Sequence, residues 1–243
     1  MIFNLFKSKP TLKELIPNGF VDIHSHILPG IDDGAKNIEE SLVLITEMKK
    51  MGFSKIIGTP HTYPGLYNNS NESIKDSFEK LKKEFDLDIG LCYASEYMID
   101  SSLIKKAKDN KLMCIKENYV LIEMSYLAPP INLYEIIFEL KVNGFIPILA
   151  HPERYFFFSD NFKEYYKLKK VGCLFQANLL SATNFYGLQA AKIMDLLLKR
   201  DLFDFVGSDI HKLRHIKAFD SNIILKQKKK FQEVISKNKF FEN

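Results

Sequence analysis

The chain has 243 residues, of which 46% are hydrophobic and 26% charged, as expected for a globular protein with one sizeable core. Lys and Arg number 34 against 30 Asp and Glu, and the surplus is mostly scattered lysine, which argues against a nucleic-acid partner. The three cysteines lie far apart with no Cys-x-x-Cys pair, so neither a disulfide scaffold nor a thiolate zinc site is predicted.

The chain carries no predicted targeting segment. Lys7, Lys9 and Lys13 interrupt the short apolar start before a signal peptide could form. The longest apolar stretches, such as 144–150 and 193–198, are much shorter than the roughly 18 to 20 residues of a membrane span. We therefore expect no membrane insertion, and a reducing cytoplasm fits the cysteine content.

Short apolar runs rich in β-branched and aromatic residues alternate with amphipathic stretches of helical period. The strands are predicted, in chain order, at 20–23, 55–58, 89–94, 119–124, 146–150, 174–177 and 204–207. The helices between and after them are predicted at 38–51, 70–85, 101–110, 133–143, 162–171, 185–200 and 223–237. This alternation predicts an α/β fold around a parallel sheet, with about seven strand-helix units.

No linker, repeat or low-complexity segment divides the chain, and about 240 residues is an ordinary size for one α/β barrel. We predict an N-terminal extension over 1–19 and a single domain over 20–243. Gly52 and Gly144 follow predicted helices at positions that suit a left-handed C-terminal cap.

The unusual polar residues follow the predicted strands. Parallel strands in a barrel have their carboxyl ends on one face, so these residues are expected to share one pocket. In chain order they are His24 and His26, His61, Glu96, Glu123, His151, and Asp209 with His211.

Imidazoles and carboxylates together are good ligands for divalent transition metals, so a polynuclear metal centre is predicted. Each residue alone has another interpretation. One His-x-His is common by chance, Glu123 could be a buried charge paired with a lysine, and His151 could be a hydrogen-bonded core histidine. Repetition at six of seven strand ends favours the metal centre.

Six segments of the sequence resemble the motifs of the PHP superfamily, and within it the CpsB/CapC/YwqE group of bacterial tyrosine-protein phosphatases. They are Phe-Val-Asp-Ile-His-Ser-His-Ile-Leu-Pro-Gly-Ile-Asp-Asp-Gly at 20–34, Gly-Thr-Pro-His at 58–61, Ala-Ser-Glu at 94–96, Ile-Glu-Met-Ser at 122–125, Ala-His-Pro-Glu-Arg at 150–154 and Gly-Ser-Asp-Ile-His at 207–211. The resemblance runs in order over nearly the whole chain.

The resemblance implies a distorted TIM-like (β/α)7 barrel, the PHP fold, with three divalent ions at the strand ends. Manganese is the first expectation, with iron, cobalt, zinc and magnesium as alternatives. The implied ligands are His24, His26, Glu96 and Asp209 for one ion; Glu96, Glu123 and His151 for a second; and Asp33, His61 and His211 for a third. Asp33 is favoured by its place in the motif, although composition does not separate it from Asp32. Asp22 is expected behind the ligands, orienting an imidazole.

Such a centre suits phosphoester hydrolysis, in which metal-bound water supplies hydroxide near neutral pH. Arg154 is the expected phosphate clamp, with a surface salt bridge as its alternative, and Arg214 is a weaker candidate. Tyr155 opens an aromatic run that could stack on a phosphotyrosine ring or pack within a loop. His215 could donate a proton but is expected to be a solvated helix residue.

Cysteine-dependent phosphatase chemistry is excluded, because Met98, Val120 and Leu179 stand six positions after the cysteines where that chemistry needs arginine. The resemblance implies a phosphatase for phosphotyrosine, acting on the tyrosine-rich tail of a membrane-bound kinase of capsule or exopolysaccharide export. The alternatives are a histidinol-phosphatase or nucleotide phosphoesterase, a metal-dependent amidohydrolase, and a non-catalytic module that binds a phosphorylated tail. An amidohydrolase is disfavoured because it normally has a bridging lysine where this chain offers glutamate. The sequence leaves the oligomeric state open.

Overall fold

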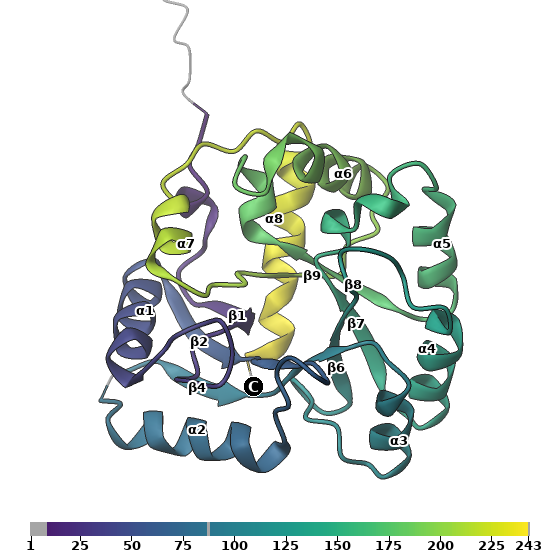
Figure 1. The fold of residues 1–243 in the computed structure, drawn as a ribbon. Coiled ribbons are helices and arrows are strands. Elements are labelled where there is room, and N and C mark those ends of the chain that lie inside the picture. Colours follow the sequence, from purple (N-terminus) through teal and green to yellow (C-terminus); the bar gives the residue numbers. More distant parts are fainter. Residues whose placement is uncertain (1–8, 87, 243) are drawn as a thin grey trace, which may run out of the picture.

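A computed structural model describes residues 9–86 and 88–242 of the chain, which form parallel sheets with helices packed around them (Figure 1). The strands are β1 (Phe20–Ser25), β2 (Phe53–Gly58), β3 (His61–Thr62), β4 (Gly90–Tyr93), β5 (Glu96–Met98), β6 (Tyr119–Glu123), β7 (Ile146–Ala150), β8 (Leu174–Asn178) and β9 (Phe205–Gly207). The helices are α1 (Ile38–Lys50), α2 (Asn71–Lys83), α3 (Ser102–Lys108), α4 (Leu133–Val142), α5 (Lys163–Lys170), α6 (Gly187–Lys199), α7 (Leu213–Ala218) and α8 (Lys228–Lys237). Their alternation confirms the predicted α/β class.

The strands are divided between two sheets, ordered β1-β2-β4 and β3-β5-β6-β7-β8-β9, and every paired strand is parallel. All seven predicted strands are present. The short strands β3 and β5 were not predicted, and each follows a break of two residues, Thr59-Pro60 after β2 and Ala94-Ser95 after β4. These breaks carry the chain from one sheet to the other.

The first and last strands meet at their carboxyl ends. The Asp209 amide donates to the His24 carbonyl at 2.8 Å, and the His26 amide donates to the Ile210 carbonyl at 2.9 Å. These bonds join the end of β1 to the segment after β9. The described residues do not form one closed sheet, so the TIM-like barrel stays a prediction.

The opposite end of the strands is covered by the C-terminal segment. Phe241 is buried against Phe205 and Tyr119, and the Lys55 ammonium donates to the Phe241 carbonyl at 2.9 Å. Phe241 also joins the apolar side chains between the sheets, including Ile23 and Leu121, in one buried cluster. The amino ends of the strands are therefore covered by apolar side chains.

Two helices differ from the prediction. The last helix begins at Lys228 rather than at residue 223, because the amides of Lys226 and Gln227 donate to the Asp195 carboxylate, each at 2.8 Å, instead of to a helical carbonyl. The short helix α7 was not predicted. Gly52 and Gly144 have φ of 99° and 86°, as their predicted capping positions require.

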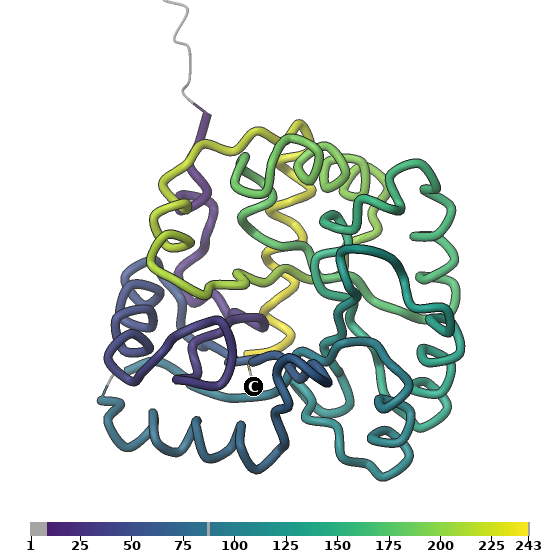
Figure 2. Tube along the Cα trace, viewed as in Figure 1, coloured from purple at the N-terminus to yellow at the C-terminus, as the bar shows by residue number. Residues whose placement is uncertain are grey.

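Residues 10–13 lie along the late segment 219–223, where the purple part of the tube passes the yellow-green part (Figure 2). The Leu12 amide donates to the Ser221 carbonyl at 3.0 Å, and the Leu12 side chain is buried in the main core. No helix of the described residues is long and apolar enough to cross a membrane.

Candidate metal centre

The first group of predicted ligands surrounds the end of β1. The Nε2 atoms of His24 and His26 are 3.2 Å apart. Glu96 Oε2 lies 3.2 Å from His24 Nε2 and 3.4 Å from His26 Nε2, and Asp209 Oδ1 lies 3.4 and 3.3 Å from the same two atoms. Two imidazoles and two carboxylates from β1, β5 and the segment after β9 therefore meet at one point.

Glu96 connects this group to a second one. Its Oε2 lies 3.1 Å from His61 Nδ1, which is in turn 2.8 Å from Glu123 Oε1. Its Oε1 lies 3.2 Å from His151 Nε2. Glu96 thus lies between the two groups, where a bridging ligand would stand.

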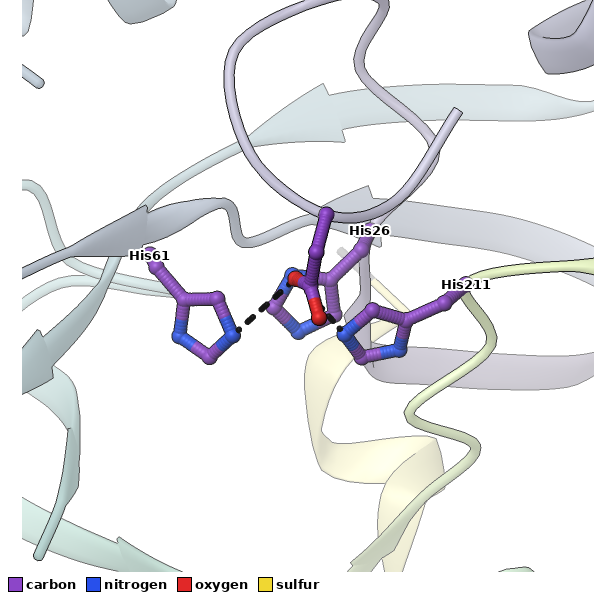
Figure 3. Close-up of side chains that lie close together, drawn as sticks. His26, His61 and His211 are labelled. Carbon is purple, nitrogen blue, oxygen red and sulfur yellow. Dashed lines mark ion pairs between the residues drawn. The ribbon is translucent and has the colours of Figure 1, made fainter. Parts of the chain in front are cut away.

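A third group lies toward the solvent. Asp33 Oδ1 is 3.5 Å from His61 Nε2 and 3.3 Å from His211 Nε2. The ring of His26 stacks on that of His211 with centroids 3.8 Å apart. Figure 3 shows the rings of His26, His61 and His211 close together, with dashed lines for the two ion pairs.

The donor set fits divalent metal ions. Within each of four overlapping groups, one ligand atom per residue lies within 4.8 Å of all the others. The groups are His26, Asp33, His61 and His211; His24, His151 and Asp209; His24, His26 and Glu96; and His61, Glu96 and Glu123. Glu96 Oε2, Glu123 Oε1 and His61 Nδ1 are buried and close to one another, but among the described residues none of the three makes a hydrogen bond of acceptable geometry. Orphaned buried polar atoms are costly, and cations would satisfy them.

The pKa values of the buried side chains also indicate that positive charge is needed in the centre. Burial would raise the pKa of Glu96, but the charges of His24 and His61 hold it well below its usual range. Burial and His26 would lower the pKa of His61, but Glu96 and Glu123 raise it to about 10. The buried carboxylates thus require positive charge beside them, which protons or metal ions can supply.

Three of the imidazoles are held from behind, as metal-bound histidines usually are. His24 Nδ1 donates to Gln176 Oε1 at 2.9 Å, His26 Nδ1 to Asp32 Oδ2 at 2.7 Å, and His211 Nδ1 to the Asp209 carbonyl at 2.9 Å. Each bond leaves Nε2 to face the centre with its lone pair.

These contacts separate the two aspartates that the sequence could not. Asp32 is buried behind His26, whereas the Asp33 side chain is 49% exposed and lies between His61 and His211. Asp33 therefore lies with the predicted ligands, whereas Asp32 orients the ring of His26.

The role predicted for Asp22 is wrong. Its carboxylate accepts from the Ser208 amide at 2.8 Å and from the Ser208 hydroxyl at 2.5 Å, and among the described residues it has no hydrogen bond to an imidazole. The reason is that β1 lies next to β9, which places Asp22 beside Ser208. Burial raises the pKa of Asp22 to about 6. Asp22 fixes the segment that leads into Asp209, and Gln176 orients His24 in its place.

His151 and Asp209 have left-handed backbone conformations, with φ of 38° and 53°. Such angles are uncommon for residues other than glycine and persist only where the surroundings enforce them. The His151 amide donates to the Gln176 carbonyl at 2.8 Å, and the Asp209 amide is held by His24. Two predicted ligands are thus among the five described non-glycine residues with positive φ.

Arg154 lies beside the centre. Its Nη1 donates to Asp209 Oδ2 at 2.8 Å, and Asn178 Nδ2 donates to the same oxygen at 2.9 Å. The guanidinium carbon is 4.0 Å from the ring centroid of Tyr186 and 4.8 Å from that of Tyr126. Two aromatic rings and a carboxylate therefore fix this arginine.

The sequence interpretation missed four of these residues. Gln176 and Asn178 are polar residues within the otherwise apolar β8, and that break in pattern was the available signal. Tyr126 and Tyr186 lie in connecting segments, where no periodicity marks them.

A cavity of about 200 Å³ opens over the centre. Its lining includes Asp33, His61, Glu123, His151, Asp209 and His211 from the predicted ligands, and Tyr126, Arg154, Phe185, Tyr186, Lys212, Arg214 and His215 around them. Arg214 is exposed at the rim, and its Nε lies 3.4 Å from His215 Nε2. The cavity thus combines ligand atoms, cationic side chains and aromatic walls.

Two expectations about this rim are wrong. Tyr155 is fully buried and its hydroxyl accepts from the Met124 amide at 2.9 Å, because the turn at 152–154 directs the side chain into the core. It therefore cannot touch a substrate. His215 is buried rather than solvated; its Nδ1 accepts from the His211 amide at 3.0 Å, and burial lowers its pKa to about 4.

Comparisons with known proteins agree on one family. The sequence model described as "Capsular polysaccharide synthesis, CpsB/CapC" matches residues 20–243. Tyrosine-protein phosphatase CpsB of Streptococcus pneumoniae is 30% identical over 203 residues, 79% of this chain and 83% of that protein. Tyrosine-protein phosphatase YwqE of Bacillus subtilis is 28% identical over 198 residues, 80% and 78% of the two chains.

A solved structure gives the same result. It comes from work on YwqE of Bacillus subtilis and CpsB of Streptococcus pneumoniae, described as unique metal-dependent tyrosine phosphatases. It superposes with a TM-score of 0.77 at 27% identity, covering 89% of this chain and 86% of that one.

Proposed function

The chain belongs to the CpsB/CapC family, and on this premise we propose that it is a metal-dependent phosphatase that hydrolyses phosphotyrosine in proteins. The observation that carries the proposal is the position of Arg154, fixed by Asp209 at the edge of a cavity whose floor consists of metal-ligand side chains. An arginine beside such a floor suits a phosphate group, and the aromatic walls suit a tyrosine ring.

The proposed cofactors are three divalent metal ions. Mixed nitrogen and oxygen ligands suit several such ions, among them manganese, iron, cobalt and zinc, and the family resemblance makes manganese the first expectation. The resemblance assigns His24, His26, Glu96 and Asp209 to one ion, Glu96, Glu123 and His151 to a second, and Asp33, His61 and His211 to a third. In the second set Glu96 lies 3.2 Å from His151, whereas Glu123 lies 2.8 Å from His61. When bound, such ions supply Lewis acidity and hydroxide at neutral pH.

The chain's own side chains bind and orient the substrate. Arg154 Nη1 is occupied by Asp209, which leaves the other guanidinium N–H groups to bind phosphate oxygens. Asp209 Oδ2 accepts from Arg154 and Asn178, so its Oδ1 is left to face the imidazoles. Arg214 at the rim is the second proposed phosphate-binding residue.

The neutral ring of His215 does not suit the role of proton donor. Its low pKa leaves it uncharged near neutrality, and its Nδ1 is already engaged by the His211 amide. A phenol is a good enough leaving group to depart without a strong acid, because its pKa is about 10. This argument favours aryl over alkyl phosphate esters.

The proposed substrate is the tyrosine-rich tail of a membrane-bound kinase of capsule or exopolysaccharide synthesis, dephosphorylated in the cytoplasm. The family description and the free cysteines Cys92, Cys114 and Cys173 support this setting. The proposed fold of the catalytic domain, residues 20–243, is a distorted TIM-like (β/α)7 barrel. The backbone bonds between the end of β1 and the segment after β9 support it.

The test compares the turnover of a phosphotyrosine peptide, histidinol phosphate and an oligonucleotide, each with and without a chelator. We expect metal-dependent release of phosphate from the peptide, and little turnover of the other two. Rapid turnover of another ester with no activity on phosphotyrosine would refute the proposal. Tight binding of the phosphopeptide without turnover in the metal-loaded protein would instead assign a binding module.

A further inference from the structure

A second depression, of about 440 Å³, lies beside the catalytic cavity between α1 and α7. These two helices are neighbours in the fold (Figure 1). The surface of this α1–α7 groove is mostly apolar and is supplied by Val43 and Leu44 from α1 and by Leu213 from α7. Leu44 belongs to the core, but Val43 and Leu213 are each 45% exposed. The groove therefore presents apolar surface that could still be buried.

The groove adjoins the catalytic cavity. His211 and Lys212 line both depressions, and they connect β9 to α7. A phosphotyrosine whose phosphate reaches Arg154 keeps its peptide backbone at the mouth of the cavity, since the side chain is attached there. The substrate residues on either side of the phosphotyrosine must then lie across the rim of the cavity. The α1–α7 groove begins at that rim.

We propose that the α1–α7 groove binds the substrate residues that flank the phosphotyrosine, and that it selects an apolar side chain there. The proposal rests on the proposed phosphatase function and adds a substrate preference to it. Val43 and Leu213 are the residues that set this preference, because their exposed side chains lie next to the shared wall.

The charged residues of the groove do not favour one charge. Lys36 and Lys212 are balanced by Glu39 and Glu40, and Glu40 also accepts a hydrogen bond from the Lys36 amide at 3.0 Å. Opposite charges in similar number give little net attraction for an acidic or a basic segment. The apolar floor is therefore the feature that discriminates between flanking residues.

The experiment uses the metal-loaded full chain and a set of phosphotyrosine peptides. In each peptide one flanking position carries leucine in place of glycine, and free phosphotyrosine is the reference substrate. Relative to the peptide with glycine at every flanking position, we expect leucine at one flanking position or more to raise kcat/KM by about tenfold, the size of effect that an apolar contact gives. The double variant Val43→Ala/Leu213→Ala should lose that gain.

Val142→Ala is the matched control, because Val142 is an exposed valine, 65% accessible, on the distant helix α4. It should keep the preference for leucine. Two results would overturn the proposal. One is that kcat/KM is the same with leucine as with glycine at every flanking position, and the other is that the double variant keeps the gain in kcat/KM. A change in oligomeric mass of the double variant with the peptide preference intact would assign the groove to a second copy of the chain. Absence of turnover for free phosphotyrosine and every peptide would instead refute the phosphatase function itself.

Discussion

The paired substitutions Asp32→Asn and Asp33→Asn should have different effects, although they make the same chemical change at adjacent positions. Asp32 accepts three N–H groups: its Oδ2 from His26 Nδ1 at 2.7 Å and the His61 amide at 3.2 Å, and its Oδ1 from the Gly34 amide at 2.8 Å. Asparagine has one acceptor oxygen and one NH2 group. In either orientation of the asparagine side chain, its NH2 group faces an N–H group that Asp32 accepts in the wild type.

Both orientations of the asparagine introduced by Asp32→Asn are unfavourable. With the oxygen toward Gly34, the NH2 group faces His26 Nδ1 and favours the tautomer whose proton is on Nε2, the atom that faces the centre. With the oxygen toward His26, the Gly34 amide loses its partner. A buried donor left unpaired costs about 1–3 kcal/mol, which for a chain of this size lowers the Tm by roughly 2–12 °C. Loss of the group that orients a metal-bound histidine weakens metal binding about 10–100-fold.

Asp33→Asn should destabilise the chelated protein by less than about 1 kcal/mol, because its side chain is half exposed and its contacts with His61 and His211 are screened by solvent. It should nevertheless lower the metal content, since a ligand carboxylate becomes neutral. The assays are thermal unfolding with and without chelator and elemental analysis after dialysis. Normal metal content in Asp33→Asn, together with depleted metal and unchanged stability in Asp32→Asn, would reverse the two roles and refute the reasoning.

Three further predictions concern the arginine, the buried tyrosine and the protons of the centre. Arg154→Lys keeps the charge but loses the planar fork, and should lower kcat/KM for a phosphotyrosine peptide about 10–100-fold, whereas the control Arg200→Lys should not. Tyr155→Phe removes the acceptor of the Met124 amide, so the free energy of unfolding measured with denaturant should fall by about 1–3 kcal/mol while KM stays unchanged. A higher KM with normal stability would instead show that Tyr155 contacts the substrate. His61, with a pKa of about 10, is protonated near neutrality in the metal-free protein, so metal binding should release protons and strengthen from pH 6 to 8. Calorimetry in buffers of different ionisation enthalpy measures that release, and its absence would contradict the assignment.

The sequence brings the predicted ligands into one region because they lie at the carboxyl ends of the predicted strands. The carboxyl ends of parallel strands converge, so a correct strand map already brings His24, Glu123 and His151 into one region. The strands themselves were recognisable because they are short runs of buried apolar residues. The pattern of apolar residues along the chain is thus enough to predict the region in which these residues lie.

The supporting contacts could not be predicted in the same way. Asp22 pairs with Ser208, and Gln176 with His24, across strands that are distant in the sequence, so only the three-dimensional order of the strands selects the partner. Tyr155 lies in a run of four aromatic residues whose individual orientations depend on the turn before it. The start of α8 was misplaced because Asp195 captures the amides of Lys226 and Gln227, a contact without a local signal.

The backbone bonds that join the end of β1 to the segment after β9 also set the order in which the centre can be assembled. His24 and His26 are synthesised early, whereas Asp209 and His211 come almost at the end of the chain. At about 5–20 residues per second, the ribosome needs roughly 10 to 40 seconds to cover that interval. During that interval His24 and His26 have been synthesised, but β9 and the segment that carries Asp209 and His211 have not. The complete set of predicted ligands therefore exists only late in biosynthesis, and a chain that stops before β9 lacks Asp209 and His211.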